Sequence, residues 1–81
     1  MISCNDYDYI EIVCLYRYPV KLFLRTGDVI QGVAIDTKRD EDREECIELQ
    51  VNGKAQLVIL DTISKLEVTK DNPHFTEVSF D

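Results

Sequence analysis

The pair Asn52-Gly53 constrains the fold of this chain more than any other feature, because it separates two runs of apolar residues. A type I′ turn requires positive φ at both of its central positions, and Asn followed by Gly adopts it most readily. Before the turn, Ile47, Leu49 and Val51 alternate with polar residues, which is typical of a half-buried strand. The sequence therefore predicts an antiparallel hairpin here.

Short strands joined by turns are also predicted for the rest of the chain after Pro19, where Thr26-Gly27-Asp28 is a further turn signal. The predicted strands cover residues 20–25, 29–36, 46–51, 56–60, 63–68 and 76–80. Gly32 lies inside the second strand, where a missing side chain indicates a bulge, a bend or a close backbone approach. Residues 37–45 are densely charged and contain no hydrophobic residue, which predicts a mobile, solvated loop.

The segment 5–17 is predicted to be a short amphipathic helix, although its Ile, Val and Tyr content favours a strand. Asn5 or Asp6 can cap a helix, Asp8 adds negative charge to its first turn, and Pro19 ends it. At about 100° per residue, one arc collects an apolar set and the opposite arc a more polar set. The first set is Tyr9, Ile12, Val13 and Tyr16, and the second is Tyr7, Asp8 and Glu11.

These elements predict one mainly β domain over residues 1–81, with five or six antiparallel strands and one N-terminal helix. The length allows a single small core. Strands this short need closure or a cap to manage their edges. A small, strongly bent barrel with the helix laid across an open end meets both needs.

Charge and cysteine content narrow the class of protein. Sixteen Asp and Glu against nine Lys and Arg give a net charge of −7. This argues against a general nucleic-acid binder, because the binding of phosphate groups requires clustered Lys and Arg side chains. The excess favours a basic partner or serves solubility alone. The three cysteines form no redox or zinc spacing, so we expect reduced thiols in the cytoplasm, with Cys14 and Cys46 in the core. No signal peptide or membrane span is expected.

Catalysis is not expected. Three glycines build no phosphate cradle, and the single histidine, His74, has no nucleophile motif near it. The acidic run between residues 40 and 45 lacks the spacing of a calcium loop. The sequence thus predicts neither an enzyme nor a bound metal or cofactor.

The placement of the charges is more informative than their sum, because residues 1–16 contain Asp6, Asp8 and Glu11 and no basic residue. On a helix, Asp8 and Glu11 would project together one turn apart, beside the ring of Tyr7. This arrangement suits a protein interface that meets Arg or Lys. The alternative is that the acids only cap a helix whose outer face is hydrated.

Two resemblances bear on that choice. Residues 20–36 resemble the first motif of Sm-like barrels, and residues 60–68 more loosely resemble the second, without its RNA-contacting basic–Gly pair. The chain also resembles the Rho-binding antiterminator (Rof) family over about residues 2–68. That likeness rests on Ile2-Ser3-Cys4-Asn5-Asp6-Tyr7-Asp8, Ile10-Glu11-Ile12-Val13-Cys14, the Sm-like hairpin and Leu60-Asp61-Thr62-Ile63.

The Rof resemblance implies a helix-capped Sm-like barrel that binds the termination factor Rho and blocks its loading onto transcripts. It implies that Asp8 and Glu11 contact Rho, with Asp6 and Tyr7 beside them. We expect a second contact in the charged loop and a monomer when free, without direct binding of nucleic acid or membrane. The loop residues concerned are Lys38, Arg39, Asp40 and Asp42. The alternative function is an Sm-like RNA-binding module.

Overall fold

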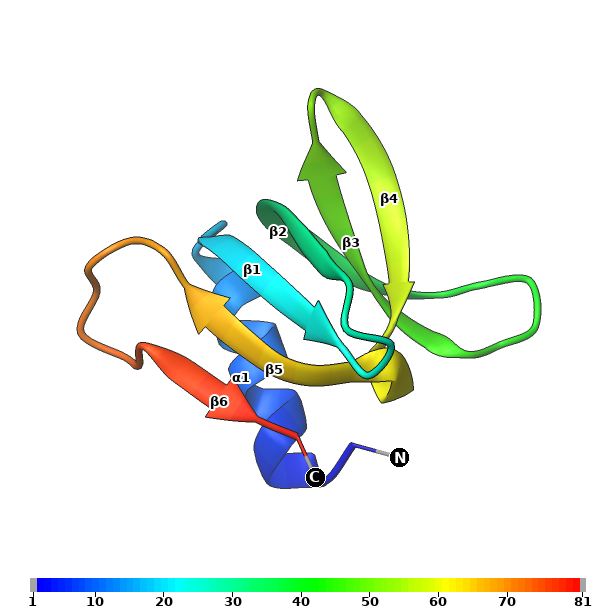
Figure 1. Cartoon of the computed structure of the whole chain (residues 1–81), viewed down its shortest axis with the longest axis horizontal. Helices are drawn as coiled ribbons and strands as arrows, with labels where there is room; N and C mark the ends of the chain where they lie inside the picture. The colour runs from blue at the N-terminus through cyan, green and yellow to red at the C-terminus, as the bar shows by residue number, and fades with distance from the viewer. Residues whose placement is uncertain (1, 81) are drawn as a thin grey trace.

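The computed structural model describes residues 2–80, which form one helix and a single sheet of six antiparallel strands. The elements are α1 (Cys4–Leu15), β1 (Pro19–Leu24), β2 (Val29–Arg39), β3 (Glu45–Val51), β4 (Lys54–Ile59), the 3-10 turn η1 (Leu60–Thr62), β5 (Ile63–Val68) and β6 (Glu77–Ser79). The strand order is β4-β3-β2-β1-β5-β6. Helix α1 lies behind β1, β5 and β6, and the β3–β4 hairpin projects away from them (Figure 1). The predicted mainly β fold class is confirmed.

The turn between β3 and β4 is the predicted one. Asn52 and Gly53 have φ values of 52° and 81°, so both central residues are left-handed, as a type I′ turn requires. Val51 and Lys54 pair directly across it. A local signal of two residues therefore fixes the register of this hairpin.

Gly32 permits a close approach between β2 and β3. A Cβ atom at this position would lie 2.6 Å from the carbonyl oxygen of Gln50 and 2.9 Å from Cγ2 of Val51. Only a residue without a side chain fits such a gap. Of the three alternatives given for this glycine, a bulge, a bend or a close backbone approach, the last is therefore present.

The two ends of α1 differ from the prediction. The side chain of Ser3 caps the helix by accepting a hydrogen bond from the backbone N–H of Asp6 at 3.2 Å, in place of Asn5 or Asp6 as the cap. At the other end, the N–H of Tyr18 donates to the carbonyl of Val13, and Arg17 adopts a left-handed φ of 55°. This Schellman-type closure ends the helix at Leu15, two residues before the predicted limit of residue 17.

The buried face of α1 is rotated from the predicted one. The side chains of Ile10, Val13 and Cys14 are buried, at i, i+3 and i+4. Tyr7 is half-buried and packs against the same core, whereas Tyr16 is 51% exposed. The prediction was wrong because the three tyrosines and two isoleucines of this segment can define more than one apolar arc, since a tyrosine ring also packs at a surface.

The core is closed at the C-terminal end of the chain. Phe80 is 2% exposed, and Arg25 donates hydrogen bonds to the carbonyls of Phe80 and Asp61, each at 2.9 Å. The segment between β5 and β6 packs on α1, because the ring of Phe75 meets that of Tyr9 edge-on at 4.8 Å. Strand β6 covers Glu77–Ser79, inside the range 76–80 predicted for the last strand.

The same segment carries the single histidine. His74 is exposed, but Nδ1 of its ring lies 2.8 Å from the hydroxyl of Tyr18, and the ring stacks on Tyr16 at 4.6 Å. These contacts join the C-terminal end of α1 to a loop 56 residues away. The histidine therefore packs against the tyrosines that follow the helix.

The mobile loop predicted for residues 37–45 is instead mostly paired. Strand β2 continues to Arg39, and Thr37, Lys38 and Arg39 pair with Ile47, Cys46 and Glu45. Only residues 40–44 form the turn. The prediction was wrong because ion pairs across the two strands offset the absence of apolar side chains.

Candidate partner-binding site

Helix α1 packs against strand β2, and an open groove of about 1000 Å³ lies between them. One wall is helical and the other belongs to β2. The groove is lined by Tyr7, Asp8, Glu11, Ile12, Cys14, Leu15, Arg17, Ile35, Asp36 and Thr37. The structure thus places three of the four predicted helix residues in one concave surface.

The helical wall follows from the spacing of its residues. Tyr7, Glu11 and Cys14 are separated by four and three positions, so they stack along one stripe of the helix. Asp8, Ile12 and Leu15 repeat this spacing one residue later. Two neighbouring stripes therefore supply apolar and acidic side chains side by side.

The strand wall depends on a bulge in β2. The register between β2 and β3 shifts between Ala34 and Asp36, leaving Ile35 as the extra residue. Consecutive residues of a regular strand point to opposite faces, but a bulge re-aims them. Ile35, Asp36 and Thr37 accordingly all line the groove.

The charge of the groove is predominantly negative, with three carboxylates and one guanidinium, that of Arg17. Asp8 and Glu11 are exposed, and within residues 2–80 neither carboxylate accepts a hydrogen bond or forms an ion pair. Asp36 accepts one hydrogen bond, from the N–H of Thr37 at 2.8 Å. The two helical carboxylates are therefore available to a cationic partner.

Asp6 and Tyr7 take different positions. Asp6 is half-buried in the first turn of α1 and does not line the groove. Tyr7 is half-buried and lines both this groove and a smaller hollow of about 220 Å³ beside Lys38 and Arg39. Tyr7 therefore connects the predicted helix site to the predicted loop site.

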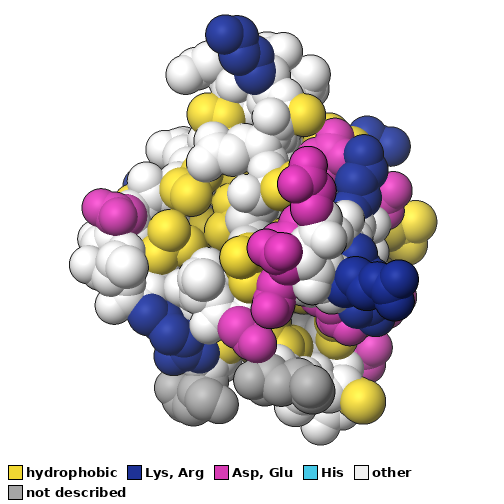
Figure 2. Space-filling view, turned by 90° about the vertical axis from the view of Figure 1, so that its right-hand side faces the viewer, with side chains coloured by type: hydrophobic (Ala, Val, Ile, Leu, Met, Phe, Trp, Pro, Cys, Tyr) yellow, Lys and Arg dark blue, Asp and Glu magenta, His cyan; other side chains and the backbone are white. Residues whose placement is uncertain are grey.

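The residues predicted as a second contact, Lys38, Arg39, Asp40 and Asp42, lie in or beside the β2–β3 turn. Most of them form ion pairs or hydrogen bonds within the chain. Lys38 pairs with Glu48 at 2.7 Å, and this contact raises the pKa of the Lys38 ammonium. Arg39 pairs with Glu45 at 3.3 Å. Seen from the side on which this turn projects, Asp and Glu side chains form a band with Lys and Arg beside it (Figure 2).

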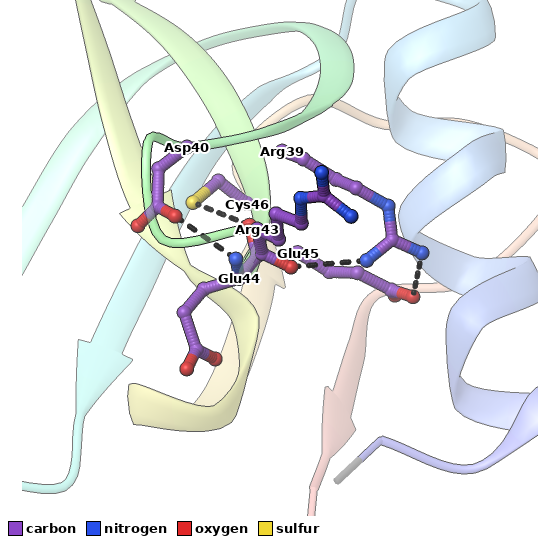
Figure 3. Close-up of polar contacts among 6 residues, drawn as sticks. All are labelled: Arg39, Asp40, Arg43, Glu44, Glu45 and Cys46. Carbon is purple, nitrogen blue, oxygen red and sulfur yellow. Dashed lines mark hydrogen bonds and ion pairs between the residues drawn. The ribbon is translucent and has the colours of Figure 1, made fainter.

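Asp40 and Asp42 differ in what they do within the turn. Oδ1 of Asp40 accepts hydrogen bonds from the backbone N–H groups of Asp42 and Glu44, both at 2.9 Å, and Figure 3 shows the second of these. The side chain of Asp42 is exposed, with no hydrogen bond or ion pair inside residues 2–80. Asp40 therefore holds the turn, and Asp42 is free to contact a partner.

The two buried cysteines, Cys14 and Cys46, offer no reactive thiolate. Burial, with smaller effects from the Asp36 and Glu11 carboxylates, raises the pKa of the Cys14 thiol to about 12. Cys46 is also buried, and burial raises its pKa as well. Among residues 2–80 no group of three His, Cys, Asp or Glu side chains is arranged to hold a metal ion. No helix within this range is long and apolar enough to cross a membrane.

Sequence reasoning missed Leu15, Ile35 and Asp36 as members of the site. Asp36 ends the Sm-like motif, which was the only signal that singled it out. Asp36 and Glu11 line the same groove because α1 packs across the sheet at β2. The local sequence around either residue does not encode this packing. Leu15 was missed because the helix was predicted to continue beyond it.

Comparison with known proteins gives a consistent result. A family model described as modulator of Rho-dependent transcription termination (ROF) matches residues 1–80. The structure of YaeO bound to magnesium, from Vibrio cholerae O395, is similar to this chain with a TM-score of 0.89 and 41% sequence identity. That match covers 93% of this chain and 97% of the other. No curated protein sequence matches the chain.

Proposed function

The chain belongs to the family of modulators of Rho-dependent transcription termination (ROF), and we propose that it inhibits termination by binding Rho through the α1–β2 groove. In this proposal, Asp8 and Glu11 pair with Arg and Lys side chains by which Rho holds RNA. The bound protein then prevents the loading of RNA. The observation that carries the proposal is the pair of exposed, unengaged carboxylates on one wall of a groove.

The chemistry of competition with RNA supports this assignment. A protein that binds an RNA backbone holds its phosphates with Lys and Arg, and a carboxylate forms charge-assisted hydrogen bonds with the same groups. Asp8 and Glu11 project from one helix, so their spacing is set before binding and little conformational entropy is lost. Tyr7 adds apolar area beside them, and Asp6 adds negative charge at the margin.

The charged turn extends the proposed interface. Tyr7 lines the hollow that also contains Lys38 and Arg39, so a partner seated in the groove would reach the turn next. Asp42 has the free carboxylate of this group, whereas Asp40 is used by the turn itself. We assign Asp42 a secondary contact at the rim, where charge pairs change the rate of association more than the affinity.

Charge reversal on the helix tests the proposal. We expect Asp8→Lys and Glu11→Lys each to lower the affinity for Rho at least about tenfold, because each replaces an attractive charge pair by a repulsive one. The matched control is Asp71→Lys, which reverses an exposed acid in the segment between β5 and β6. The control should change the affinity less than about twofold. Isothermal titration calorimetry with purified Rho measures all three.

A competition assay completes the test. Wild-type protein should displace a fluorescent single-stranded RNA from Rho, and the two helix variants should not. If Asp8→Lys and Glu11→Lys displaced RNA as well as wild type, the assigned face would be wrong. A gel shift with the same RNA and without Rho distinguishes this function from that of an Sm-like RNA-binding module, which would retard the RNA directly.

A further inference from the structure

Leu15 is the most exposed large hydrophobic residue in the described part of the chain. Its side chain is 73% exposed, against 44% for Leu57 in β4 and 51% for Val29 in β2. It is the last residue of α1 and lines the groove. A single exposed leucine is ordinary in proteins. A leucine that lines a groove, however, can be covered by an apolar side chain of a binding partner.

The surroundings of Leu15 in the groove are both apolar and acidic. The half-buried side chains of Ile12 and Ile35 line the same surface, one from each wall. Leu15 follows Glu11 by four residues and Asp8 by seven, so these carboxylates lie along the helix from it on the same side. The groove is therefore an apolar strip bordered by negative charge.

From this combination we propose that the groove binds a basic peptide segment of the partner protein that carries a large apolar side chain. The apolar side chain packs on Leu15, Ile12 and Ile35. Arg or Lys side chains next to it pair with Asp8 and Glu11 on the helix wall and with Asp36 on the strand wall. This inference rests on the proposed function, because it names the part of Rho that occupies the same groove.

Charge complementarity selects this occupant. Three carboxylates repel a nucleic-acid backbone and an anionic lipid surface, and they attract a segment that bears Arg or Lys. A purely basic segment would leave Leu15 without a contact. A purely apolar segment would remove the carboxylates from water without giving them a cationic partner, which costs free energy. A segment of both kinds contacts the apolar strip and the three carboxylates together.

The truncation Leu15→Ala tests the apolar contact. We expect it to weaken binding to Rho about tenfold, because it removes most of the apolar area of one packed leucine. The control Leu57→Ala truncates the same residue type at an exposed site on β4 and should leave the affinity unchanged. Both side chains are exposed, so both variants should keep the urea midpoint of the wild type. Titration calorimetry at about 0.1 M and 0.5 M NaCl gives the affinities.

Salt and heat capacity separate the apolar contact from the charge pairs. The loss caused by Leu15→Ala should be the same at both salt concentrations, whereas the loss caused by Asp8→Lys should shrink at the higher one. The heat-capacity change of binding should be less negative for Leu15→Ala than for the wild type.

The possible outcomes divide cleanly between the two proposals. If Asp8→Lys weakens binding and Leu15→Ala does not, the apolar contact is refuted and the proposed function stands. If Leu57→Ala weakens binding as much as Leu15→Ala, the groove is not the apolar site. If neither Asp8→Lys nor Leu15→Ala weakens binding, both proposals fail. If the protein binds single-stranded RNA and Leu15→Ala abolishes that binding, the occupant is a nucleic acid and the inference is overturned.

Discussion

A buried thiol forms part of the lining of the groove. Cys14 is 8% exposed, and its pKa of about 12 keeps it protonated at neutral pH. A thiolate here would add a fourth negative charge close to Asp36 and Glu11. Because the thiol is neutral, the residue behaves as a small apolar side chain between the two acidic walls.

The raised pKa of Cys14 predicts a loss of stability at high pH. The unfolded chain releases this proton near pH 9 and the folded protein near 12, so the contribution is complete below about pH 9 and is lost as the pH rises towards 12. The free energy of unfolding should fall by roughly 1 kcal/mol per pH unit in this window from this group alone. Urea denaturation between pH 8 and 10.5 measures the slope.

The matched variant for this measurement is Cys14→Ala, which has no group to titrate at this position. Its free energy of unfolding should be lower than that of the wild type at pH 8 but should decline less steeply with pH. All other side chains are common to the two proteins, so the difference between their slopes isolates the contribution of Cys14. Parallel slopes for the two would show that Cys14 does not carry the effect.

At the scale of single elements, the β2–β3 turn shows how a charged segment becomes ordered. The carboxylate of Asp40 accepts two backbone hydrogen bonds, and the N–H of Asp40 donates to the carbonyl of Glu44 at 3.0 Å. Arg43 takes a left-handed φ of 64° to close the turn. Local hydrogen bonds of this kind stabilise turns without any apolar burial.

Removal of one carboxylate should therefore destabilise this turn selectively. We expect Asp40→Ala to lower the free energy of unfolding by about 1 to 2 kcal/mol, because two backbone N–H groups lose their acceptor. Asp42→Ala should cost less than about 0.5 kcal/mol, since within residues 2–80 its carboxylate has no such role. Urea denaturation compares the two, and hydrogen exchange at the Glu44 amide locates the change. Equal losses for both variants would contradict the role assigned to Asp40.

The elements themselves were largely predictable, because they depend on local signals. Asn52-Gly53 specified a hairpin, and Gly32 indicated an irregularity of β2, of which a close backbone approach was one of three alternatives. The errors occurred where tertiary contacts decide. The Schellman closure at Arg17 shortened the helix. The contact of the helix with β2 selected which of its faces is buried. Neither is encoded by periodicity alone.

At the scale of the whole molecule, the candidate site was predictable in part. Asp8 and Glu11 were identified from helical spacing and from the absence of nearby bases, and the structure leaves both exposed. Ile35 and Asp36 were not, because they enter the groove through a bulge whose position no residue pattern specified. Their place in the groove depends on how a helix and a strand from different parts of the chain pack together.

The net charge of −7 predicts how the proposed complex with Rho responds to salt. The dissociation constant should rise by roughly tenfold between about 0.1 and 0.5 M NaCl, because partly exposed charge pairs are screened. Most of this change should appear in the association rate, which surface plasmon resonance measures. Asp71→Lys should show the same salt response as the wild type. An affinity independent of salt would exclude a mainly electrostatic interaction.

The contacts of Phe75 with α1, and of His74 with the tyrosines that follow it, also have a consequence for folding. The rings that hold Tyr9 and Tyr18 in place come from a segment far along the chain, and His74 lies 56 residues from Tyr18. Contacts between residues so far apart in sequence form late, after the intervening strands have folded. The acidic helix therefore acquires its final support in one of the last steps of folding.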